Sequence, residues 1–318
     1  MITVRLSQVS ETFLGHWAPL PPGPGPSVEE CLASGTLLLE RAGIESARLD
    51  AECLLAHILT CPRWLVVLEK RRRLTREQFG RYLRLLQQRE RREPLAYLLG
   101  TREFWSLPLV VASGVLIPRP ETETVVEAAL AACAELLLPS PGGPVIIDLC
   151  TGTGAIAIAL ARELPDARVF ATDSSRRALR VARANVEAHG VADRITLLRG
   201  NLWRALDGVL SNGQADLIVS NPPYIPSGAI EALMPEVQWE PRRALDGGPD
   251  GLRFHREIIA TAPRHLRPGG FLLVEIGADQ ATAARRLLEE RGSFEGFRVF
   301  QDLAGRDRVV AARRRCLN

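Results

Sequence analysis

This chain has few cysteines and histidines and a small net charge. Each of these features argues against one class of protein. The six cysteines show no CxxC spacing and no secretory disulfide framework, which predicts reduced thiols in a cytoplasmic protein. The five histidines are scattered without metal-ligand spacing, so the sequence predicts no metal site. Because 40 basic residues against 37 acidic ones leave a net charge of only +3, a global polyanion-binding role is not expected.

Long apolar runs and hydrolytic motifs are missing as well. No stretch reaches the apolar length that spans a bilayer, and the N-terminus has no signal-peptide pattern. Neither a nucleophile elbow nor a Ser/His/Asp arrangement is present. We therefore expect a soluble, intracellular protein with no membrane partner.

The length of 318 residues predicts two domains. Residues 1–26 end in a Pro-Gly run that resists helix and strand, so we expect a disordered extension there. Ser27 begins a capping box, and the apolar residues of 27–93 have helical spacing, which predicts a domain of four or five bundled helices. Residues 94–115 predict a β-hairpin linker, and residues 116–318 predict the second domain.

The helical domain contains a strongly basic run. Residues 63–92 hold eleven basic residues against three glutamates, a difference of +8. Such a run can dock an acidic protein surface or RNA, or it can be a solvated helix face. Since few aromatic residues are interleaved, we favour the solvated face, and the run carries no chemistry in either case.

A polar amide follows a buried strand in residues 216–225. Leu217, Ile218 and Val219 predict a short strand of a parallel sheet, and Asn221 stands at its carboxyl end, where open α/β sheets bind ligands. The two prolines that follow Asn221 remove backbone donors, so carbonyl groups can face a ligand without competition. The sequence predicts an acceptor-rich pocket that suits a planar amino group, although a plain turn after a strand has the same pattern.

A second pattern predicts a nucleotide site. Residues 145–148 form an apolar run closed by an acid, followed by a glycine turn at 151–154 and a helix from Ala155 to Leu164. Asp173 lies 21 residues after Gly152 and can bind a ribose diol. On these residues alone, a dinucleotide-dependent oxidoreductase remains an alternative.

Two further segments have open interpretations. Residues 116–123, Leu-Ile-Pro-Arg-Pro-Glu-Thr-Glu, precede the apolar helix 125–138; Glu121 and Glu123 either complement that helix dipole or border a substrate cleft. The loop at residues 240–248 either shapes a substrate site or is an ordinary surface loop.

The C-terminal part completes the expected sheet. Helices are predicted at 251–265 and 278–291, a turn at 268–270, a strand at 271–276, and an antiparallel pair at 297–301 and 309–312. The sheet should be mostly parallel with one reversed strand. We expect His255 on a helix surface.

Eight segments follow one another as in a known family. These are PLAYLLG, EFWSL, LIPRPETE, DLCTGTGAIAIALA, ATDSS, VSNPPYI, EPRRALDGGPDGL and FLLVEIG. Over residues 27–313 the chain resembles the HemK/PrmC family, the peptide chain release factor glutamine methyltransferases, and LIPRPETE is the most discriminating segment. The resemblance implies an α/β fold, a Rossmann-like S-adenosylmethionine-dependent methyltransferase sheet with a small N-terminal helical bundle. It also implies methyl transfer from S-adenosylmethionine to the glutamine amide in the Gly-Gly-Gln loop of release factors.

The resemblance also assigns the site. The residues it implies for the cofactor are Cys150, Thr151, Gly152, Thr153, Gly154, Asp173, Asn201, Trp203 and Asn221, with Trp203 beside the adenine. Asn221, Pro222, Pro223 and Tyr224 receive the glutamine, and Asn221, Pro222 and Tyr224 are the implied catalytic residues. Two positions depart from the family: Cys150 replaces a glycine, which is tolerable if φ is negative there, and Asn201 replaces a frequent acid.

Alternatives within the enzyme class are methylation of a ribosomal-protein glutamine or of an adenine in DNA. The chain has little room after Asn221 for a target-recognition domain, so direct nucleic-acid binding is not expected. A monomer is expected. A catalytically silent binding protein is the alternative from outside the enzymes.

Overall fold

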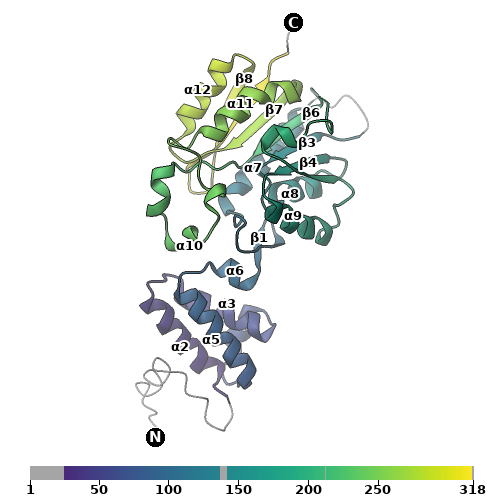
Figure 1. The fold of residues 1–318 in the computed structure, drawn as a ribbon. Coiled ribbons are helices and arrows are strands. Elements are labelled where there is room, and N and C mark those ends of the chain that lie inside the picture. Colours follow the sequence, from purple (N-terminus) through teal and green to yellow (C-terminus); the bar gives the residue numbers. More distant parts are fainter. Residues whose placement is uncertain (1–24, 137–141, 212, 317–318) are drawn as a thin grey trace. The chain divides into compact units, whose positions relative to one another are not determined.

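The computed structural model describes residues 25–136, 142–211 and 213–316 (Figure 1). It separates into two compact units that meet in sequence between Leu99 and Gly100. The extension expected at residues 1–26 lies, up to position 24, outside the described residues. No helix in the described residues has both the length and the apolar character to cross a membrane.

The first unit is helical, as predicted. Its helices are α2 (Val28–Arg41), α3 (Ala47–Leu59), α4 (Arg63–Leu68), α5 (Arg76–Glu90) and α6 (Leu95–Leu99). The capping box is confirmed, because Ser27 Oγ accepts from the Glu30 amide at 3.2 Å and Glu30 Oε2 accepts from the Ser27 amide at 2.7 Å.

Part of the basic run is used inside this unit. Arg89 forms a buried ion pair with Asp50 at 2.7 Å, where both side chains are less than a tenth exposed. Arg63 pairs with Glu52 at 2.8 Å, and Arg92 donates to the Gly43 carbonyl at 2.7 Å. These contacts tie α5 and the start of α4 to α3 and to the turn after α2, so the run has a structural role in addition to any solvated face.

The predicted hairpin is present and belongs to the second unit. Strands β1 (Thr101–Phe104) and β2 (Leu107–Val110) are joined by Trp105 and Ser106, both at positive φ, as a tight two-residue turn requires. The carboxylate of Glu123 accepts from the Trp105 amide at 2.7 Å, so this glutamate fixes the hairpin turn. Residues 95–99, which the sequence places in the linker, form α6 of the helical unit.

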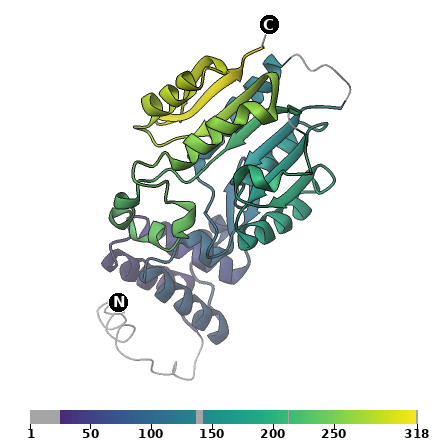
Figure 2. The same cartoon turned by 45° about the horizontal axis from the view of Figure 1, so that its top comes forward.

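The second unit contains a seven-stranded sheet with the order β5-β4-β3-β6-β7-β9-β8. The strands are β3 (Val145–Leu149), β4 (Arg168–Asp173), β5 (Ile195–Arg199), β6 (Ala215–Ser220), β7 (Leu266–Glu275), β8 (Phe294–Gln301) and β9 (Asp307–Arg314). Strand β9 runs antiparallel to both of its neighbours, and the other pairs are parallel. The mostly parallel sheet with one reversed strand is therefore confirmed, and the C-terminal strands form one edge (Figure 2).

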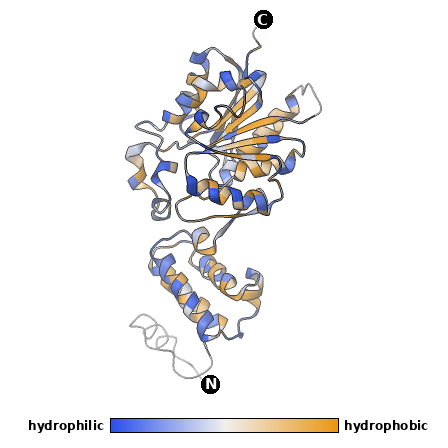
Figure 3. Cartoon of the chain, turned by 45° about the vertical axis from the view of Figure 1, so that its right-hand side comes forward, coloured by the Kyte–Doolittle hydropathy of each residue, from blue (hydrophilic) through white to orange (hydrophobic). Residues whose placement is uncertain are grey.

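Helices cover both faces of this sheet, and the strands between them are mostly hydrophobic (Figure 3). One face packs on α7 (Glu123–Glu135) and α8 (Ala155–Glu163), through residues such as Ile146 and Leu217. The other packs on α11 (Arg253–His265) and α12 (Ala281–Arg291), through residues such as Ile147 and Ile218. The remaining elements are α9 (Arg176–Ala188), α10 (Pro235–Gln238) and the 3₁₀ turns η1 (Pro120–Thr122), η2 (Leu202–Ala205), η3 (Ser227–Ala232) and η4 (Arg242–Ala244).

One element differs from its prediction. The expected turn at 268–270 lies inside β7, because Ala215 pairs with Leu266 while Leu217 already pairs with Phe271. The residues between Leu266 and Phe271 bulge out of the ladder, with Gly269 at a φ of 79°. The Pro-Gly-Gly sequence therefore marks a bulge within a strand, and the strand begins earlier than expected.

Candidate active site

A pocket lies at the carboxyl ends of β3, β4 and β6. The chain runs outward from β3 to β4 and β5, then returns to the other side of β3 as β6, so the strand order reverses between β3 and β6. Open α/β sheets bind ligands at such a switch point. The lining includes Gly114, Val115, Leu116, Cys150, Gly152, Asp173, Ser175, Asn201, Leu202, Asn221, Pro223, Arg243 and Phe254.

The glycine loop is held by its own backbone and by two carboxylates. The Thr151 hydroxyl donates to Asp148 at 2.5 Å, and the Gly152 amide donates to Asp173 at 3.0 Å. The Thr153 carbonyl accepts from the Asn185 side chain at 2.9 Å. Thus Gly152 lines the pocket, whereas Thr151 and Thr153 anchor the loop from behind, as does Gly154, which caps α8 at a φ of 84°.

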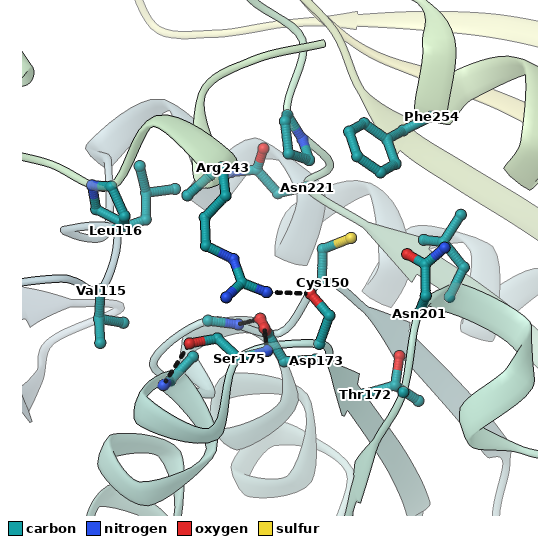
Figure 4. A pocket seen from close by; sticks show the side chains of 18 of the residues that line it. Val115, Leu116, Cys150, Thr172, Asp173, Ser175, Asn201, Asn221, Arg243 and Phe254 are labelled. Atoms are coloured by element: carbon teal, nitrogen blue, oxygen red, sulfur yellow. Dashed lines mark hydrogen bonds between the residues drawn. The ribbon is translucent and has the colours of Figure 1, made fainter. Parts of the chain in front are cut away.

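Asp173 lies in the part of the pocket formed by the ends of β3 and β4, which the sequence predicts to bind the cofactor and which we call the cofactor side (Figure 4). One carboxylate oxygen accepts from Gly152, and the other accepts from the Ser175 amide at 2.7 Å. Burial raises the pKa of Asp173, and the backbone donors offset part of that rise. Arg243 reaches across the pocket and donates to the Ser174 hydroxyl at 2.7 Å, so a cation closes this side.

The condition that would make Cys150 easily tolerable, a negative φ, is not met. Its φ is 62°, in the left-handed region that favours glycine. The conformation is set by the loop, in which the Thr151 amide donates to the Thr172 carbonyl at 2.9 Å. Burial raises the pKa of the Cys150 thiol, so the sulfur that lines the pocket is neutral rather than a thiolate nucleophile.

Asn201 and Trp203 have different surroundings. Asn201 is exposed and lines the pocket, as its predicted contact with the cofactor requires. Trp203 is buried and stacks on His265 at 4.5 Å between ring centroids, while its indole donates to the Glu257 carbonyl at 3.3 Å. Its neighbour Leu202 lines the pocket instead. The role of Trp203 beside an adenine stays a prediction.

On the acceptor side, Asn221 and Pro223 line the pocket. The Asn221 amide nitrogen donates to Thr122 Oγ1 at 3.0 Å, which leaves the Asn221 carbonyl oxygen for a ligand. Pro222 and Tyr224 lie outside the lining. The Tyr224 carbonyl accepts from Gln280 at 2.9 Å, and burial raises the pKa of the Tyr224 hydroxyl, which therefore stays protonated.

A buried carboxylate joins the two loops with open interpretations. Glu240 accepts from Arg119 at 2.5 Å and from the Ile117 amide at 3.0 Å, and its side chain is 1% exposed. Together with the Thr122 contact to Asn221, this pairing places residues 117–122 at the acceptor side rather than at a helix end alone. Both segments stand out as motifs in the sequence. Their pairing could not be predicted from it, because Arg119 and Glu240 are 121 residues apart.

His255 is fully buried, so the prediction that it lies on a helix surface is wrong. Its Nε2 contacts the Glu275 carbonyl at 2.8 Å, and burial lowers its pKa to about 4, so the ring is neutral near pH 7. The apolar pattern of α11 did not indicate this placement, because histidine is polar and a polar residue is usually assigned to the exposed face of a helix. Among the described residues, no group of three or more His, Cys, Asp or Glu is arranged to hold a metal ion.

The sheet order, the glycine loop and the acid at the end of the second strand define a Rossmann-like methyltransferase domain. Two family models match the chain: the PrmC N-terminal domain over residues 30–100 and the methyltransferase small domain over residues 130–239. The chain belongs to the release factor glutamine methyltransferase family.

Relatives and a solved structure carry that family name. The release factor glutamine methyltransferase of Moorella thermoacetica is 44% identical over 91% of this chain and 99% of the relative. That of Geobacter sulfurreducens is 43% identical over 86% of this chain and 92% of the relative. A crystal structure of a release factor-specific protein-(glutamine-N5) methyltransferase from Alicyclobacillus acidocaldarius is 31% identical, covers 65% of this chain and 99% of that chain, and has a TM-score of 0.39.

Proposed function

We propose that this protein transfers a methyl group from S-adenosylmethionine to the side-chain amide nitrogen of the glutamine in the Gly-Gly-Gln loop of peptide chain release factors. The observation that supports the proposal is that Asn221, whose side-chain nitrogen donates to Thr122, lines the pocket at the end of β6, in a chain whose relatives are named for this activity over most of their length.

The cofactor side fits S-adenosylmethionine. Asp173 is a half-buried acceptor at the end of β4, where a ribose diol can donate to it, and Gly152 lets the backbone approach the ligand closely. Asn201, across the pocket, offers an amide oxygen to an adenine amino group. When bound, S-adenosylmethionine supplies an electrophilic methyl group on a sulfonium. The chain's own contribution is to hold the acceptor amide against it.

A carboxamide nitrogen is a poor nucleophile because its lone pair is delocalised into the carbonyl. In the proposed complex the Asn221 side-chain oxygen accepts one N–H of the glutamine, and the carbonyl of Pro222, which is not part of the pocket lining, accepts the other. These two contacts fix the amide plane and turn the nitrogen toward the methyl group. Positioning of this kind supplies roughly 7–11 kcal/mol in favourable cases. Because the two prolines lack N–H donors, no backbone group of Pro222 or Pro223 competes for these acceptors.

The test is mass spectrometry of an unmodified release factor after incubation with the protein and S-adenosylmethionine. We expect one added methyl group on the glutamine of the Gly-Gly-Gln loop and none on a Gln→Ala release factor. Parallel incubations contain a ribosomal-protein substrate and an adenine-containing DNA. Methylation of either of these, with an unmodified release factor, would overturn the proposal and keep the methyltransferase class.

A further inference from the structure

A buried carboxylate with no assigned role, that of Glu275, lies on the strand next to Asn221. Glu275 ends β7 and is 0% exposed; neither of its carboxylate oxygens has a hydrogen bond of good geometry among the described residues, although the Thr122 and Tyr224 hydroxyls lie near enough to offset part of the rise that burial causes in its pKa. Ser220 pairs with Val274 in the parallel ladder of β6 and β7, so the next residue on each strand is Asn221 or Glu275. The sheet register therefore brings residues Asn221 and Glu275 next to each other at the ends of neighbouring strands.

The groups around Glu275 come from several elements. The hydroxyls of Thr122 and Tyr224 are its polar neighbours, Arg308 approaches from β9, and Glu121 adds a second negative charge from η1. Arg308 is itself held by Asp302 at 3.1 Å and donates to the Ile276 carbonyl at 3.2 Å. His255 contacts only the backbone carbonyl of Glu275 and is neutral near pH 7.

Thr122 links the Glu275 carboxylate to the side-chain amide of Asn221. A threonine hydroxyl has one proton to donate and lone pairs that accept. Here the lone pairs accept from the Asn221 amide nitrogen at 3.0 Å, so the hydroxyl proton has to point elsewhere. A carboxylate only accepts, so a negative Glu275 draws that proton and leaves Thr122 able only to accept from Asn221. The Asn221 oxygen is then the atom that faces the substrate.

We propose that Glu275 is a positioning residue that fixes, through Thr122, which end of the Asn221 amide faces the substrate. This inference rests on the proposed function. With the Thr122 hydroxyl turned toward Glu275, the three groups form one chain: the Thr122 hydroxyl donates to Glu275, and the Asn221 nitrogen donates to Thr122. A neutral Glu275 donates to Thr122 instead, which allows the Thr122 proton to turn toward Asn221 and favours the opposite orientation of the amide.

The hydrogen-bonded chain predicts a pH dependence with a defined sign. Burial raises the pKa of Glu275 to about 7, while the two hydroxyls and Arg308 offset part of that rise. Since the carboxylate is the active form, kcat should rise with pH through about 7 and fall below it. Glu275→Gln keeps the shape of the side chain but has no negative charge to hold the Thr122 proton, and its amide can either accept or donate at any pH, so its kcat should be lower and nearly independent of pH in this range.

The decisive experiment measures kcat, KM and the dissociation constant of S-adenosylmethionine for four variants on the release factor. A hydrogen bond to a charged group is worth about 1.5–3 kcal/mol, so Glu275→Gln and Thr122→Val should each lower kcat about 10- to 100-fold. The cofactor affinity should not change, and Thr122→Ser should retain activity because it keeps the hydroxyl. The kcat of the double variant should be no lower than that of the less active single variant, because both substitutions interrupt the same series of hydrogen bonds.

A control separates this effect from loss of stability. Leu288→Ala on α12 opens a cavity in the core that packs on the same sheet, far from the acceptor residues in sequence, and should lower Tm while keeping kcat. If Glu275→Gln keeps the wild-type kcat and pH profile, or if the two single effects multiply, the proposal fails. Should Glu275→Gln not fold, the comparison of Thr122→Val with Thr122→Ser tests the same link, and equal activity of these two variants would overturn it.

A second measurement does not depend on the substrate. The pKa of Glu275, followed by carboxyl 13C NMR, should rise in Thr122→Val because the carboxylate loses a donor. An unchanged pKa would overturn the link even if release factors proved not to be the substrate. Conversely, absence of glutamine methylation by the wild-type protein, with the expected pKa change in Thr122→Val, would overturn the proposed function and leave the hydrogen-bonded chain in place.

Discussion

The cofactor side and the acceptor side of this pocket are built in different ways. On the cofactor side, Asp148, Gly152 and Asp173 contact partners within 21 residues of themselves. On the acceptor side, Asn221 is held by Thr122, 99 residues away, and Arg119 is held by Glu240, 121 residues away. Local hydrogen bonds hold most of the cofactor side, with Arg243 and Asn185 as contacts from farther along the chain, whereas the acceptor side is formed by the meeting of distant loops.

This difference predicts which property a substitution on each side should change. A defect in the local loop should affect the cofactor first, because its contacts end in that loop. A defect on the acceptor side should affect the chemical step and the stability of the loops, since those contacts join separate parts of the chain. Variants on each side can therefore break or sharpen the comparison.

The largest effect is expected from Asn221→Ala. It removes the acceptor that fixes the glutamine amide and frees the Thr122 contact, so kcat should fall about 10²- to 10³-fold, as when one positioned hydrogen-bonding group is deleted from an active site. Single-turnover methylation followed by mass spectrometry measures the rate. Calorimetric titration with S-adenosylmethionine shows whether the variant still binds the cofactor, and the rate is compared at saturating cofactor. Full activity in a folded, cofactor-binding variant would contradict the proposed role of Asn221.

Glu240→Ala should be the most destabilising change on the acceptor side. It leaves Arg119 and the Ile117 amide without their buried partner, which should cost about 2–3 kcal/mol in the free energy of unfolding, less than for a fully buried pair because Arg119 is 31% exposed. Urea unfolding measures the loss. The control is Glu290→Ala, which breaks an exposed pair with Arg286 and should cost less than about 0.5 kcal/mol. Equal losses would show that the Glu240 pair does not hold the two loops.

The same contrast explains what could be predicted from the sequence. The strand ends, the glycine loop and Asp173 were predictable because their partners are close in sequence or lie at the ends of neighbouring parallel strands. The pairing of Glu240 with Arg119 and of Thr122 with Asn221 was not, because nothing in one sequence states which distant loops meet. The left-handed φ of Cys150 could not be predicted either, since loop hydrogen bonds rather than local preference determine it.

Asp173→Asn should act on the cofactor side alone. An amide has one acceptor oxygen and no charge, so one of the two backbone donors from Gly152 and Ser175 loses its partner. We expect S-adenosylmethionine to bind about tenfold more weakly. Calorimetry measures the affinity, and Asp193→Asn, on an exposed side chain, is the control that should change nothing. Unchanged cofactor binding with a reduced kcat would remove the proposed division between the two sides.

The smallest effect is expected from Cys150→Gly. We compare it with the same substitution at Cys133, where the backbone is helical. At Cys150 the left-handed φ costs a non-glycine residue about 1–2 kcal/mol, and glycine relieves this while losing packing and gaining freedom in the unfolded chain. These effects oppose one another, so the free energy of unfolding should change by less than about 1 kcal/mol. Cys133→Gly in α7 relieves no strain and should cost about 2 kcal/mol or more, because a buried helical position loses both side chain and propensity. Urea unfolding of the two variants decides the point: an equal loss at both positions would mean that the Cys150 backbone carries no strain, and the glycine loop would then tolerate a side chain freely.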